Sequence, residues 1–519
     1  MIVPVTKTNI EMSEEFAGAT VLVQPDQAPD AGELRVEPEP NPPENMHRRI
    51  VGLFAANIVT LVVVGLSFVA YSRLLDPSDF GLYAIALSAA TILALVLDGG
   101  LKTTIIKLDS ELSPQEESSI AVWMVLVSAG LLLLLVATEG PLLAMRPGIR
   151  HDAKFVTSFV GIALVFYPFV TLPTANMERK LRYGQLAWIE SLGMVVERGG
   201  PALLLMFTKG GIYCFVWALL ASRVLRALIL AQFHRIDFLQ VSWAGFSDSL
   251  RHLREGAWIQ AGTISAVVRD NLHTFLVGPL FGKEWIGYYA WALQICLVSS
   301  QLFAQISARV SLPLLAQAQD FGRRWPRCLF QIRLLTMLTV PVLCGMWLIL
   351  PAVDRSFFHG RWEPALALIP LLFLRMFAGM ATTPLGPLIM VQRGGSVFAK
   401  ANFQWTVVEA AGAFILLKQL GPTGLAWGYA FVVWFGLWIL LASLRQKTGG
   451  LVKELVKGIV LRPSVLSAVC VTAGAILFSK MFHLPISNIW PALCVAGVLV
   501  ACSYAVEPEL RGFVFHGKA

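Results

Sequence analysis

Charged residues are scarce in this chain of 519 residues, at 14% of the total. A soluble protein carries about 25%, so the composition excludes an ordinary soluble domain. Hydrophobic residues make up 56%, and the mean hydropathy is +0.67. The net charge of +8 would suggest a nucleic-acid partner in a soluble protein, but in a chain this apolar it indicates basic cytoplasmic loops and a basic interior. We therefore expect a multi-spanning membrane protein that binds no nucleic acid.

Catalytic and metal-binding motifs are missing as well. The sequence has no G-x-x-x-x-G-K-[ST] phosphate loop, which excludes ATP hydrolysis by this chain, and neither H-E-x-x-H nor G-x-S-x-G. Its seven cysteines include no Cys-x-x-Cys pair and no zinc spacing, so we interpret them as small buried apolar residues. The sequence predicts no cofactor and no metal site, and it favours a transporter over an enzyme.

Long apolar runs fill most of the chain. A helix needs about 20 apolar residues to cross the hydrocarbon of a bilayer, and we count about fourteen such runs. The predicted spans cover residues 50–72, 80–105, 118–145, 155–177, 184–208, 211–232, 257–281, 284–310, 327–350, 363–391, 397–418, 423–444, 461–482 and 487–506.

The spans are grouped by what lies between them. Residues 1–46 are rich in proline and acidic residues and are predicted to form a disordered cytoplasmic tail. Spans one to six form a predicted N-terminal lobe (47–232), and spans seven to twelve a C-terminal lobe (257–446). An amphipathic cytoplasmic linker (233–256) joins the lobes, and residues 447–519 hold an interfacial helix and the last two spans.

Basic residues indicate the orientation of the chain. They concentrate in the loops that follow even-numbered spans, as in Arg179, Lys180 and Arg182. Cytoplasmic loops carry such an excess of Lys and Arg, so both termini are predicted to be cytoplasmic. The loop with Arg146 and Arg150 follows an odd-numbered span and counts against the rule.

One short junction occurs twice, as "DPSDFGLYAIAL" (76–87) and as "FGKEWIGYYAWAL" (281–293). Each copy follows an odd-numbered span, on the predicted outer side. Gly81 and Gly287 are predicted to let two helix backbones approach closely, and Tyr83 and Tyr289 to lie at headgroup depth. Parallel repeats of this kind occur in transporters. The predicted fold is therefore all-α, with two pseudo-symmetric lobes around a central cavity.

The stretch "SRLLDPSDFGLYAIALSAATILALVLDGGLKTTIIK" (72–107) resembles the opening of the polysaccharide transporter family. These are Wzx-type flippases of the multidrug/oligosaccharidyl-lipid/polysaccharide superfamily. "NMERKLRYGQLAWIE" (176–190) and "SARVSLPLLAQAQD" (307–320) resemble further parts of that family. The resemblance implies that an undecaprenyl-pyrophosphate-linked oligosaccharide is flipped across a bacterial inner membrane by alternating access. It also implies membrane lipids, a polysaccharide polymerase and chain-length machinery as partners.

Several arginines fall within predicted spans. A charge at mid-bilayer costs about 2.5–3.5 kcal/mol on insertion scales, so such residues usually face a cavity or a partner. Guanidinium groups suit a diphosphate because their planar forks donate bidentate, charge-assisted hydrogen bonds. The hypothesis is that these cations line the cavity and bind the lipid-linked pyrophosphate; the alternative is internal ion pairing. The candidates are Arg198, Arg223, Arg226, Arg269 and Arg375.

Acidic residues also fall within these spans. A buried carboxylate can take up a proton or Na⁺ and couple an ion gradient to lobe movement, or it can simply pair with an arginine. The residues leave both roles open. The candidates are Asp98, Glu190, Glu197, Asp270 and Glu409. Prolines mark predicted hinges, above all in "ATTPLGPLIM" (381–390).

Two other functions compete with a flippase. An integral-membrane glycosyltransferase or polymerase using the same lipid carrier would keep catalytic carboxylates in an external loop, where Asp76 and Asp79 lie. That loop is short, however, which counts against a sugar site. The other alternative lies within the same superfamily, as a small-molecule exporter or a peptidoglycan-precursor flippase, and the Pro-x-Asp-Phe-Gly-x-Tyr junction favours the polysaccharide branch over both.

Overall fold

The computed structural model describes residues 60, 62–102, 105, 113–145, 150–180, 182–234, 236, 240–241, 243–316, 320–444 and 448–459, with Val465, Val469 and Thr472. Of these, residues 140–145, 183, 243–256, 298–310, 312–314, 316, 448–449 and 456–459 are described by their backbone alone. The predicted N-terminal tail and the last two predicted spans lie outside the described residues, apart from those three isolated positions.

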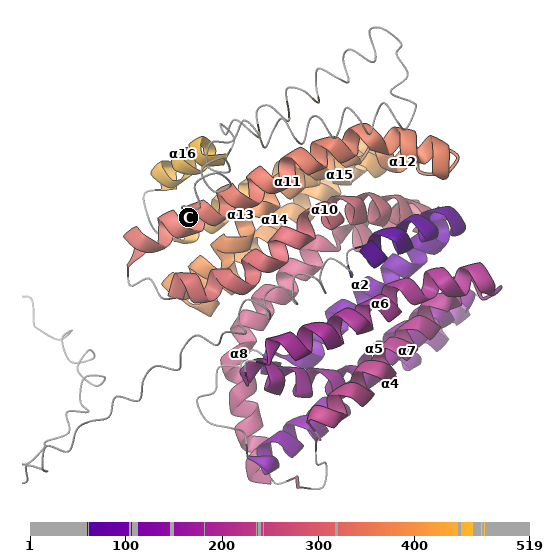
Figure 1. Cartoon of the computed structure of the whole chain (residues 1–519), viewed down its shortest axis with the longest axis vertical. Coiled ribbons are helices and arrows are strands. Elements are labelled where there is room, and N and C mark those ends of the chain that lie inside the picture. The colour runs from indigo at the N-terminus through magenta and orange to yellow at the C-terminus, as the bar shows by residue number, and fades with distance from the viewer. Residues whose placement is uncertain are drawn as a thin grey trace, which may run out of the picture. The chain divides into compact units, whose positions relative to one another are not determined.

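The regular elements of the described residues are helices, and the first group of them packs into an N-terminal lobe (Figure 1). Within this lobe α2 contacts α5, α4 contacts α5, and α7 contacts both α5 and α6. Its elements are a helix over Val62–Leu74, α2 (Pro77–Asp98), α4 (Pro114–Met145), α5 (Arg150–Arg179), α6 (Tyr183–Phe207), η2 (Gly211–Tyr213) and α7 (Cys214–Phe233).

The later helices pack into a C-terminal lobe (Figure 1). There α13 contacts α10, α11 and α15, and α14 packs along α15. Its elements are α10 (Lys283–Ala316), α11 (Phe321–Phe357), α12 (Glu363–Leu366), α13 (Ile369–Arg393), α14 (Gly395–Leu420), η4 (Gly421–Thr423), α15 (Gly424–Ser443) and α16 (Thr448–Ile459). In the described part of the chain, seven helices are long and apolar enough to cross a membrane. The chain is an all-α membrane protein built of two lobes.

The ends of α2 show why the predicted junction folds as it does. Pro77 occupies the first turn, where its missing N–H costs nothing, and Asp79 lies beside the positive end of the helix dipole. At the other end Gly99 has a φ of 56°, a left-handed cap that glycine adopts without strain. The carboxylate of Asp98 accepts a hydrogen bond from the N–H of Gly100 at 3.2 Å. The Asp-Gly-Gly sequence thus ends the helix.

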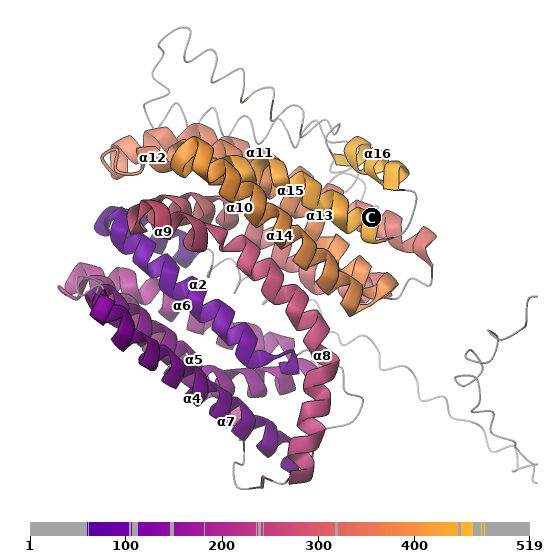
Figure 2. The same ribbon diagram turned by 180° about the vertical axis from the view of Figure 1, so that it is seen from behind.

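Helix α8 (Trp243–Asp270) connects the lobes and differs from its prediction at both ends. It runs without a break through most of the segment predicted as a separate linker (233–256). It contacts α4 and α2 of the N-terminal lobe and α14 of the C-terminal lobe, and Figure 2 shows it passing from one to the other. The seventh predicted span (257–281) is not one helix either. It breaks after Asp270 into a turn, a π-helix (His273–Val277) and the short α9 (Gly278–Phe281).

A physical reason for this break lies nearby in the sequence. Pro279 occupies the first turn of α9, and its ring nitrogen cannot donate the hydrogen bond that a continuous helix would require. The backbone N–H of Asn271 instead reaches the carbonyls of both Val267 and Val268, at 3.1 Å each. In contrast, α13 continues through the predicted hinge at residues 381–390.

The two copies of the repeated junction lie against each other, where α2 packs along α10. A Cβ added to Gly81 would lie 1.8 Å from the carbonyl oxygen of Lys283, and one added to Gly287 would lie 1.8 Å from that of Pro77. The close approach of two backbones predicted for these glycines is therefore confirmed, and each glycine approaches the other lobe's helix. We call this contact the glycine seam.

The two tyrosines of the repeat were predicted at headgroup depth, which stays a prediction, but both rings lie inside the protein and neither faces the bilayer surface. Tyr83 is 7% exposed and Tyr289 is fully buried. The Tyr83 hydroxyl accepts a hydrogen bond from Arg198 at 2.8 Å. The Tyr289 hydroxyl donates to the carbonyl of Pro422 at 2.7 Å and accepts from the N–H of Ala426 at 2.9 Å. Each tyrosine therefore fastens the seam helix to its own lobe.

Two smaller predictions concern a helix at the edge of the C-terminal lobe and the burial of the cysteines. The stretch "GLVKELVKGIV" is helical in α16, which packs against α11 and α15 and buries Leu451 and Leu455. Four of the described cysteines are buried, as predicted, and form no disulfide: Cys214, Cys296, Cys328 and Cys344. The other three lie outside the described residues.

Candidate functional site

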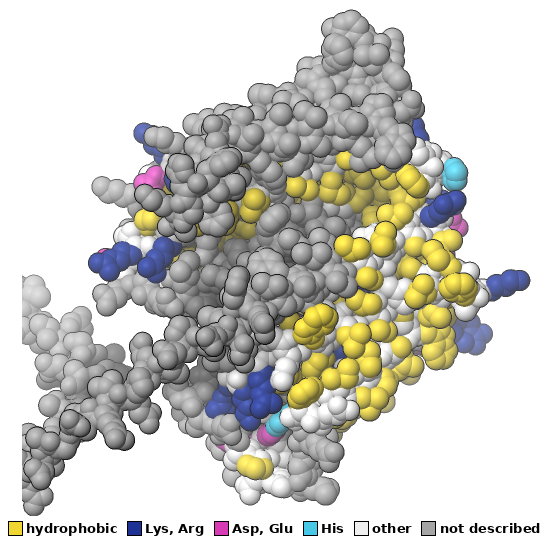
Figure 3. Space-filling view, viewed as in Figure 1, with side chains coloured by type: hydrophobic (Ala, Val, Ile, Leu, Met, Phe, Trp, Pro, Cys, Tyr) yellow, Lys and Arg dark blue, Asp and Glu magenta, His cyan; other side chains and the backbone are white. Residues whose placement is uncertain are grey.

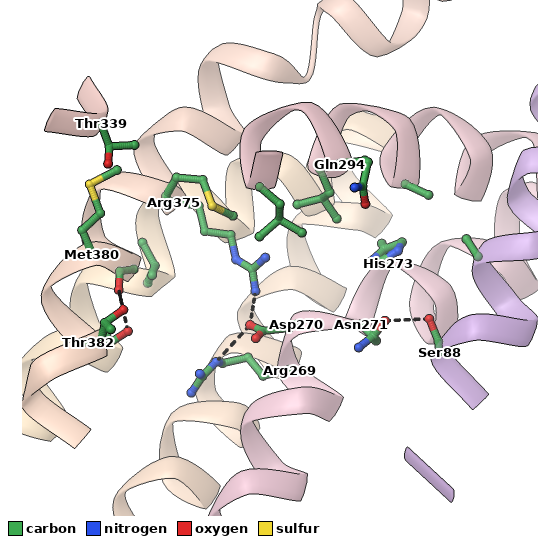
Figure 4. Close-up of a pocket in the computed structure, with 18 of the residues that line it drawn as sticks. Ser88, Arg269, Asp270, Asn271, His273, Gln294, Thr339, Arg375, Met380 and Thr382 are labelled. Carbon is green, nitrogen blue, oxygen red and sulfur yellow. Dashed lines mark hydrogen bonds and ion pairs between the residues drawn. The ribbon is translucent and has the colours of Figure 1, made fainter. Parts of the chain in front are cut away.

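A cavity of about 410 Å³ lies where α2 meets the C-terminal lobe. The N-terminal lobe contributes Ala84, Leu87 and Ser88 from α2. The rest of the wall comes from α8, from the break that follows it, and from α10, α11, α13, α14 and α15. Of the predicted site residues, Arg269, Asp270 and Arg375 line this cavity (Figure 4).

These three residues and Glu409 form one cluster of charges. Asp270 bonds Arg375 at 2.9 Å and lies 3.8 Å from the Nε of Arg269. Glu409, from α14, lies 3.6 Å from the Nε of Arg375 and 4.0 Å from that of Arg269. Two cations are therefore balanced by two anions, which is the ion pairing that the sequence left open as an alternative.

The two carboxylates of this cluster have opposite surroundings. The side chain of Asp270 is 58% exposed, whereas that of Glu409 is fully buried. Figure 4 shows the guanidinium groups of Arg269 and Arg375 converging on Asp270. Asp270 is therefore the accessible counter-ion of the pair, and Glu409 is the buried one.

Aromatic rings and an amide hold the two guanidinium groups in place. Arg269 lies over the ring of Trp405, 3.7 Å from its centroid, and donates to the side-chain oxygen of Asn402 at 3.2 Å. Arg375 lies 4.0 Å over the ring of Tyr429. Such cation–π contacts orient a guanidinium group without neutralising it. Both arginines are consequently fixed in position and only 8% exposed.

Neutral polar side chains line the part of the cavity next to α2. Ser88 donates to the side-chain oxygen of Asn271 at 2.6 Å, which ties α2 to the break after α8 (Figure 4). His273 is buried, and its Nδ1 has no hydrogen-bond partner among the described residues. Gln294, from α10, also faces this end. The cavity thus combines a wall of paired arginines and carboxylates with neutral groups that can donate and accept hydrogen bonds.

The other predicted cations form a cluster inside the N-terminal lobe. Glu197 of α6 lies 3.8 Å from Arg223 and 3.6 Å from Arg226, both on α7. Arg198 donates to Tyr83, forms no ion pair with any described carboxylate, and lines a small hollow of about 60 Å³ beside α2. Arg223 and Arg226 do not line the central cavity.

Two predicted acids lie elsewhere. Asp98 is buried at the C-terminal end of α2, where it caps the turn described above. Glu190 lies on α6, two helical turns before Glu197, and is partly buried. Neither lines the central cavity.

A second repeat, which was not recognised from the sequence, relates the two charge clusters. Val-Val-Glu occurs at residues 195–197 in α6 and again at 407–409 in α14. In each lobe the glutamate of this motif faces two arginines, at 3.6 to 4.0 Å. The motif alone would have identified Glu197 and Glu409 as related positions.

The lobes are also fastened together beyond the glycine seam. Arg361, after α11, donates to the carbonyls of Arg73 at 3.2 Å and Leu75 at 2.9 Å. The indole N–H of Trp362 donates to the carbonyl of Ser72 at 2.9 Å. Trp362 stacks on Trp291 of α10, with ring centroids 5.0 Å apart. The bonds of Arg361 and Trp362 thus join the lobes at the end that carries the repeated junctions.

Comparison with known proteins identifies the family. The model of a family described as polysaccharide biosynthesis proteins matches residues 70–367. The chain belongs to this family. One similar protein is the lipopolysaccharide biosynthesis protein WzxC of Escherichia coli (strain K12). The two are 22% identical over 403 residues, which cover 74% of this chain and 78% of WzxC. Another is the succinoglycan biosynthesis transport protein ExoT of Rhizobium meliloti (strain 1021), 23% identical, with 69% of each chain covered.

Solved structures show how this polysaccharide biosynthesis protein folds. It matches the lipid II flippase MurJ in an inward closed conformation with a TM-score of 0.69 and 14% identity, over 89% of this chain and all of MurJ. It also matches an inward-facing MATE family multidrug transporter of the MOP superfamily, with a TM-score of 0.55 and 15% identity, over 78% of this chain and 99% of the other. The resemblance to Wzx-type transporters and the two-lobed fold predicted from the sequence are confirmed.

Proposed function

We propose that the chain is a flippase for an undecaprenyl-pyrophosphate-linked oligosaccharide, which it carries across the bacterial inner membrane for exopolysaccharide, capsule or O-antigen synthesis. The observation that carries the proposal is the cavity between the lobes, with Arg269 and Arg375 on its wall. WzxC, ExoT and MurJ, whose names refer to lipopolysaccharide, succinoglycan transport and lipid II, support this substrate class.

The two carboxylates next to the arginines suggest how a diphosphate is held. A headgroup that enters the cavity meets Asp270, which is exposed, before it meets Glu409, which is buried. The diphosphate replaces Asp270 as the partner of Arg375 and Arg269, because its oxygens can bind a guanidinium group bidentately and carry more charge, whereas Asp270 uses the single oxygen Oδ1 for both arginines. Glu409 stays in place and keeps the two arginines from repelling each other. The net affinity for the diphosphate is therefore set by how much more strongly the two arginines bind it than they bind Asp270. This difference is small enough to permit release.

The neutral groups at the other end of the cavity are suited to the first sugar. Ser88, Asn271 and Gln294 lie on or next to helices of both lobes and offer hydroxyl and amide groups. A sugar that bonds to them spans α2 and the C-terminal lobe. Separation of the lobes then removes part of the binding site, so movement and release are linked.

Arg198 and the Glu197 cluster provide a second cationic region in the N-terminal lobe. Arg198 adjoins the cavity, since Ala84, Leu87 and Gln294 line both its hollow and the cavity. Arg223 and Arg226 lie deeper and are paired with Glu197. We propose that Arg198 contacts the headgroup directly and that Glu197 and Glu409 act chiefly as pairing acids.

The orientation follows from the loop charges. In the proposed topology both termini are cytoplasmic, the glycine seam lies on the outer side, and the cavity opens inward in this conformation. Alternating access then requires the seam to separate. A polymerase and its chain-length partners would take up the flipped repeat unit at the outer leaflet.

The test uses a deletion strain that accumulates lipid-linked repeat units in the inner leaflet. Arg375→Ala and Arg269→Ala should each reduce flipping at least about ten-fold, the loss of one charge-assisted contact of 1.5–3 kcal/mol. Arg375→Lys should recover part of the activity, because the charge is kept and the fork is lost. Arg323→Ala, at an exposed position of α11, is the control. Full complementation by both alanine variants, at equal expression, would refute the cationic site.

A further inference from the structure

Two ion pairs join the lobes at the end that carries the glycine seam. Lys283, the first residue of α10, has its carbonyl oxygen in the seam, and its ammonium group lies 2.7 Å from Oδ2 of Asp152 in α5. Arg361, which follows α11, lies 3.6 Å from Oδ1 of Asp76, the residue before α2. In both pairs the cation belongs to the C-terminal lobe and the acid to the N-terminal lobe. The lobes therefore present opposite charges to each other at these contacts.

The charged neighbours of Lys283 leave this attraction intact. Lys283 also attracts the carboxylate of Asp79, in the first turn of α2. Glu284, the acid next to it on α10, accepts a hydrogen bond from within its own helix. His151 lies 3.9 Å from Oδ1 of Asp152, which is not the oxygen that Lys283 binds. The ammonium group therefore faces carboxylates on two helices of the other lobe.

Both pairs are partly exposed, which limits their strength. The side chains of Lys283 and Asp152 are 41% and 27% exposed, and those of Arg361 and Asp76 are 37% and 74% exposed. Figure 3 shows charged side chains along the right-hand edge of the described surface, the side on which α12 lies in Figure 1, and hydrophobic side chains over its middle. Exposed ion pairs contribute little to stability and are screened by salt. They suit a contact that must break in every transport cycle.

Charges differ from the other lobe contacts in the distance over which they act. The glycine seam and the hydrogen bonds of Trp362 hold the lobes only while the atoms touch. Attraction between charges persists to about 8 Å at physiological ionic strength and to about 3 Å in 1 M salt. Once the helices have moved a few ångströms apart, the ion pairs are the contacts that still draw the lobes together. Charges at the rim of an interface accordingly change the rate of association and its salt dependence.

We propose that the two ion pairs form an electrostatic closing device, which draws the lobes back together after the seam has opened. The rate of closing then depends on the ionic strength on this side of the membrane. At high ionic strength the chain stays open longer and completes fewer cycles. The proposal goes beyond the proposed function and rests on it only in requiring that the seam opens and closes.

Single-molecule fluorescence energy transfer in the full chain, held in lipid nanodiscs, can measure opening and closing separately. Phe207 and Leu420 are the exposed last residues of α6 and α14, so dyes at these positions report on one lobe each. Raising potassium chloride from about 0.1 M to about 1 M should slow closing at least about two-fold. Opening should change less, because the short-range contacts of the closed seam are not screened.

Charge reversal at the first pair tests the device directly. Lys283→Glu places like charges opposite each other and should slow closing at least about three-fold in low salt, and Asp152→Lys should do the same. The double variant, Lys283→Glu with Asp152→Lys, restores the pair and should return the rate to within about two-fold of wild type. The matched control is Lys154→Glu, an exposed position on α5 that forms no ion pair among the described residues. It makes the same change in net charge as Lys283→Glu and should not slow closing.

Three results would overturn the proposal. They are a closing rate that does not respond to salt, a double variant as slow as the single ones, and a seam that stays shut in both single variants. An unchanged energy-transfer efficiency of the closed state shows that each variant is folded. No transported molecule is present in these measurements, so their failure would leave the proposed substrate standing, and a chain with a different substrate would still show the device.

Discussion

A single methyl group should be enough to disturb the glycine seam. A Cβ on Gly287 would lie 1.8 Å from the carbonyl oxygen of Pro77, whereas real Cβ contacts essentially never fall below 3.0 Å. Gly287→Ala must therefore move α2 and α10 apart by about 1.2 Å, since both partners at the contact are backbone and have no rotamer to change. We expect this variant to favour conformations in which the lobes are separated at the seam.

The size of the effect follows from the cost of overpacking. Inserting one extra carbon into a well-packed contact costs about 1–3 kcal/mol. If that cost is paid only when the seam is closed, the ratio of open to closed molecules rises by about 5- to 150-fold. The hydrogen bonds of Arg361 and Trp362 to Ser72, Arg73 and Leu75 lie at the same end, so they break when the helices separate.

Distance measurements between two spin labels can follow the seam. Leu74 lies shortly before α2, and Phe357 is the last residue of α11. Each side chain is 44% exposed. Gly287→Ala should lengthen the distance between labels at these positions. The control is Gly379→Ala in α13, where an added Cβ would meet nothing within 4 Å. An unchanged distribution in Gly287→Ala, or the same change in the control, would refute the argument that this contact holds the lobes closed.

Three further predictions concern the buried charges and the bonds that join the lobes. Glu409→Gln should lower the free energy of unfolding by about 3–5 kcal/mol, because it leaves buried arginines without their partner. Asp270→Asn should lower it clearly less, because that side chain is 58% exposed. Equal losses of the two variants in detergent denaturation would contradict the assignment of the buried and accessible acids. Arg361→Ala removes two hydrogen bonds to the other lobe, so the same label pair should report a broader distance distribution; an unchanged one would show that the arginine does not hold the lobes. Trp362→Phe keeps an aromatic side chain but loses the indole N–H that donates to the carbonyl of Ser72, so thermal denaturation should show a loss of at least about 0.5–1.5 kcal/mol, and a fully stable variant would be inconsistent with that bond's role.

The sequence was sufficient for the features that depend on composition and on short backbone contacts. Apolar runs of about 20 residues predicted most of the described helices, because only a helix satisfies its own backbone in hydrocarbon. The repeated Gly81 and Gly287 predicted a close approach of two backbones, because glycine in a helix interior has a cost that such a contact offsets. What the repeat did not reveal is that the two glycines approach each other's helices.

The pairing of the charges could not be predicted from spacing. Asp270 and Glu409 are far apart in the sequence, and only the packing of α8 and α13 against α14 brings them to the same two arginines. The burial of the tyrosines could not be predicted for a related reason: an amphipathic ring suits a headgroup, but the Tyr289 hydroxyl finds its hydrogen-bond partners inside the lobe. The break after Asp270 was overlooked because the proline that accompanies it comes nine residues later in the chain.

Because α8 contacts both lobes, a change in their relative position must bend or displace this helix. Its first part lies against α4 and α2, and it also packs on α14. Any rotation of the lobes that opens the glycine seam therefore pulls α8 toward both lobes at once. The irregular backbone begins at Asn271, directly after Asp270, the last residue of α8. Bending of α8 would therefore change the backbone next to Asp270, the carboxylate that a headgroup would have to displace.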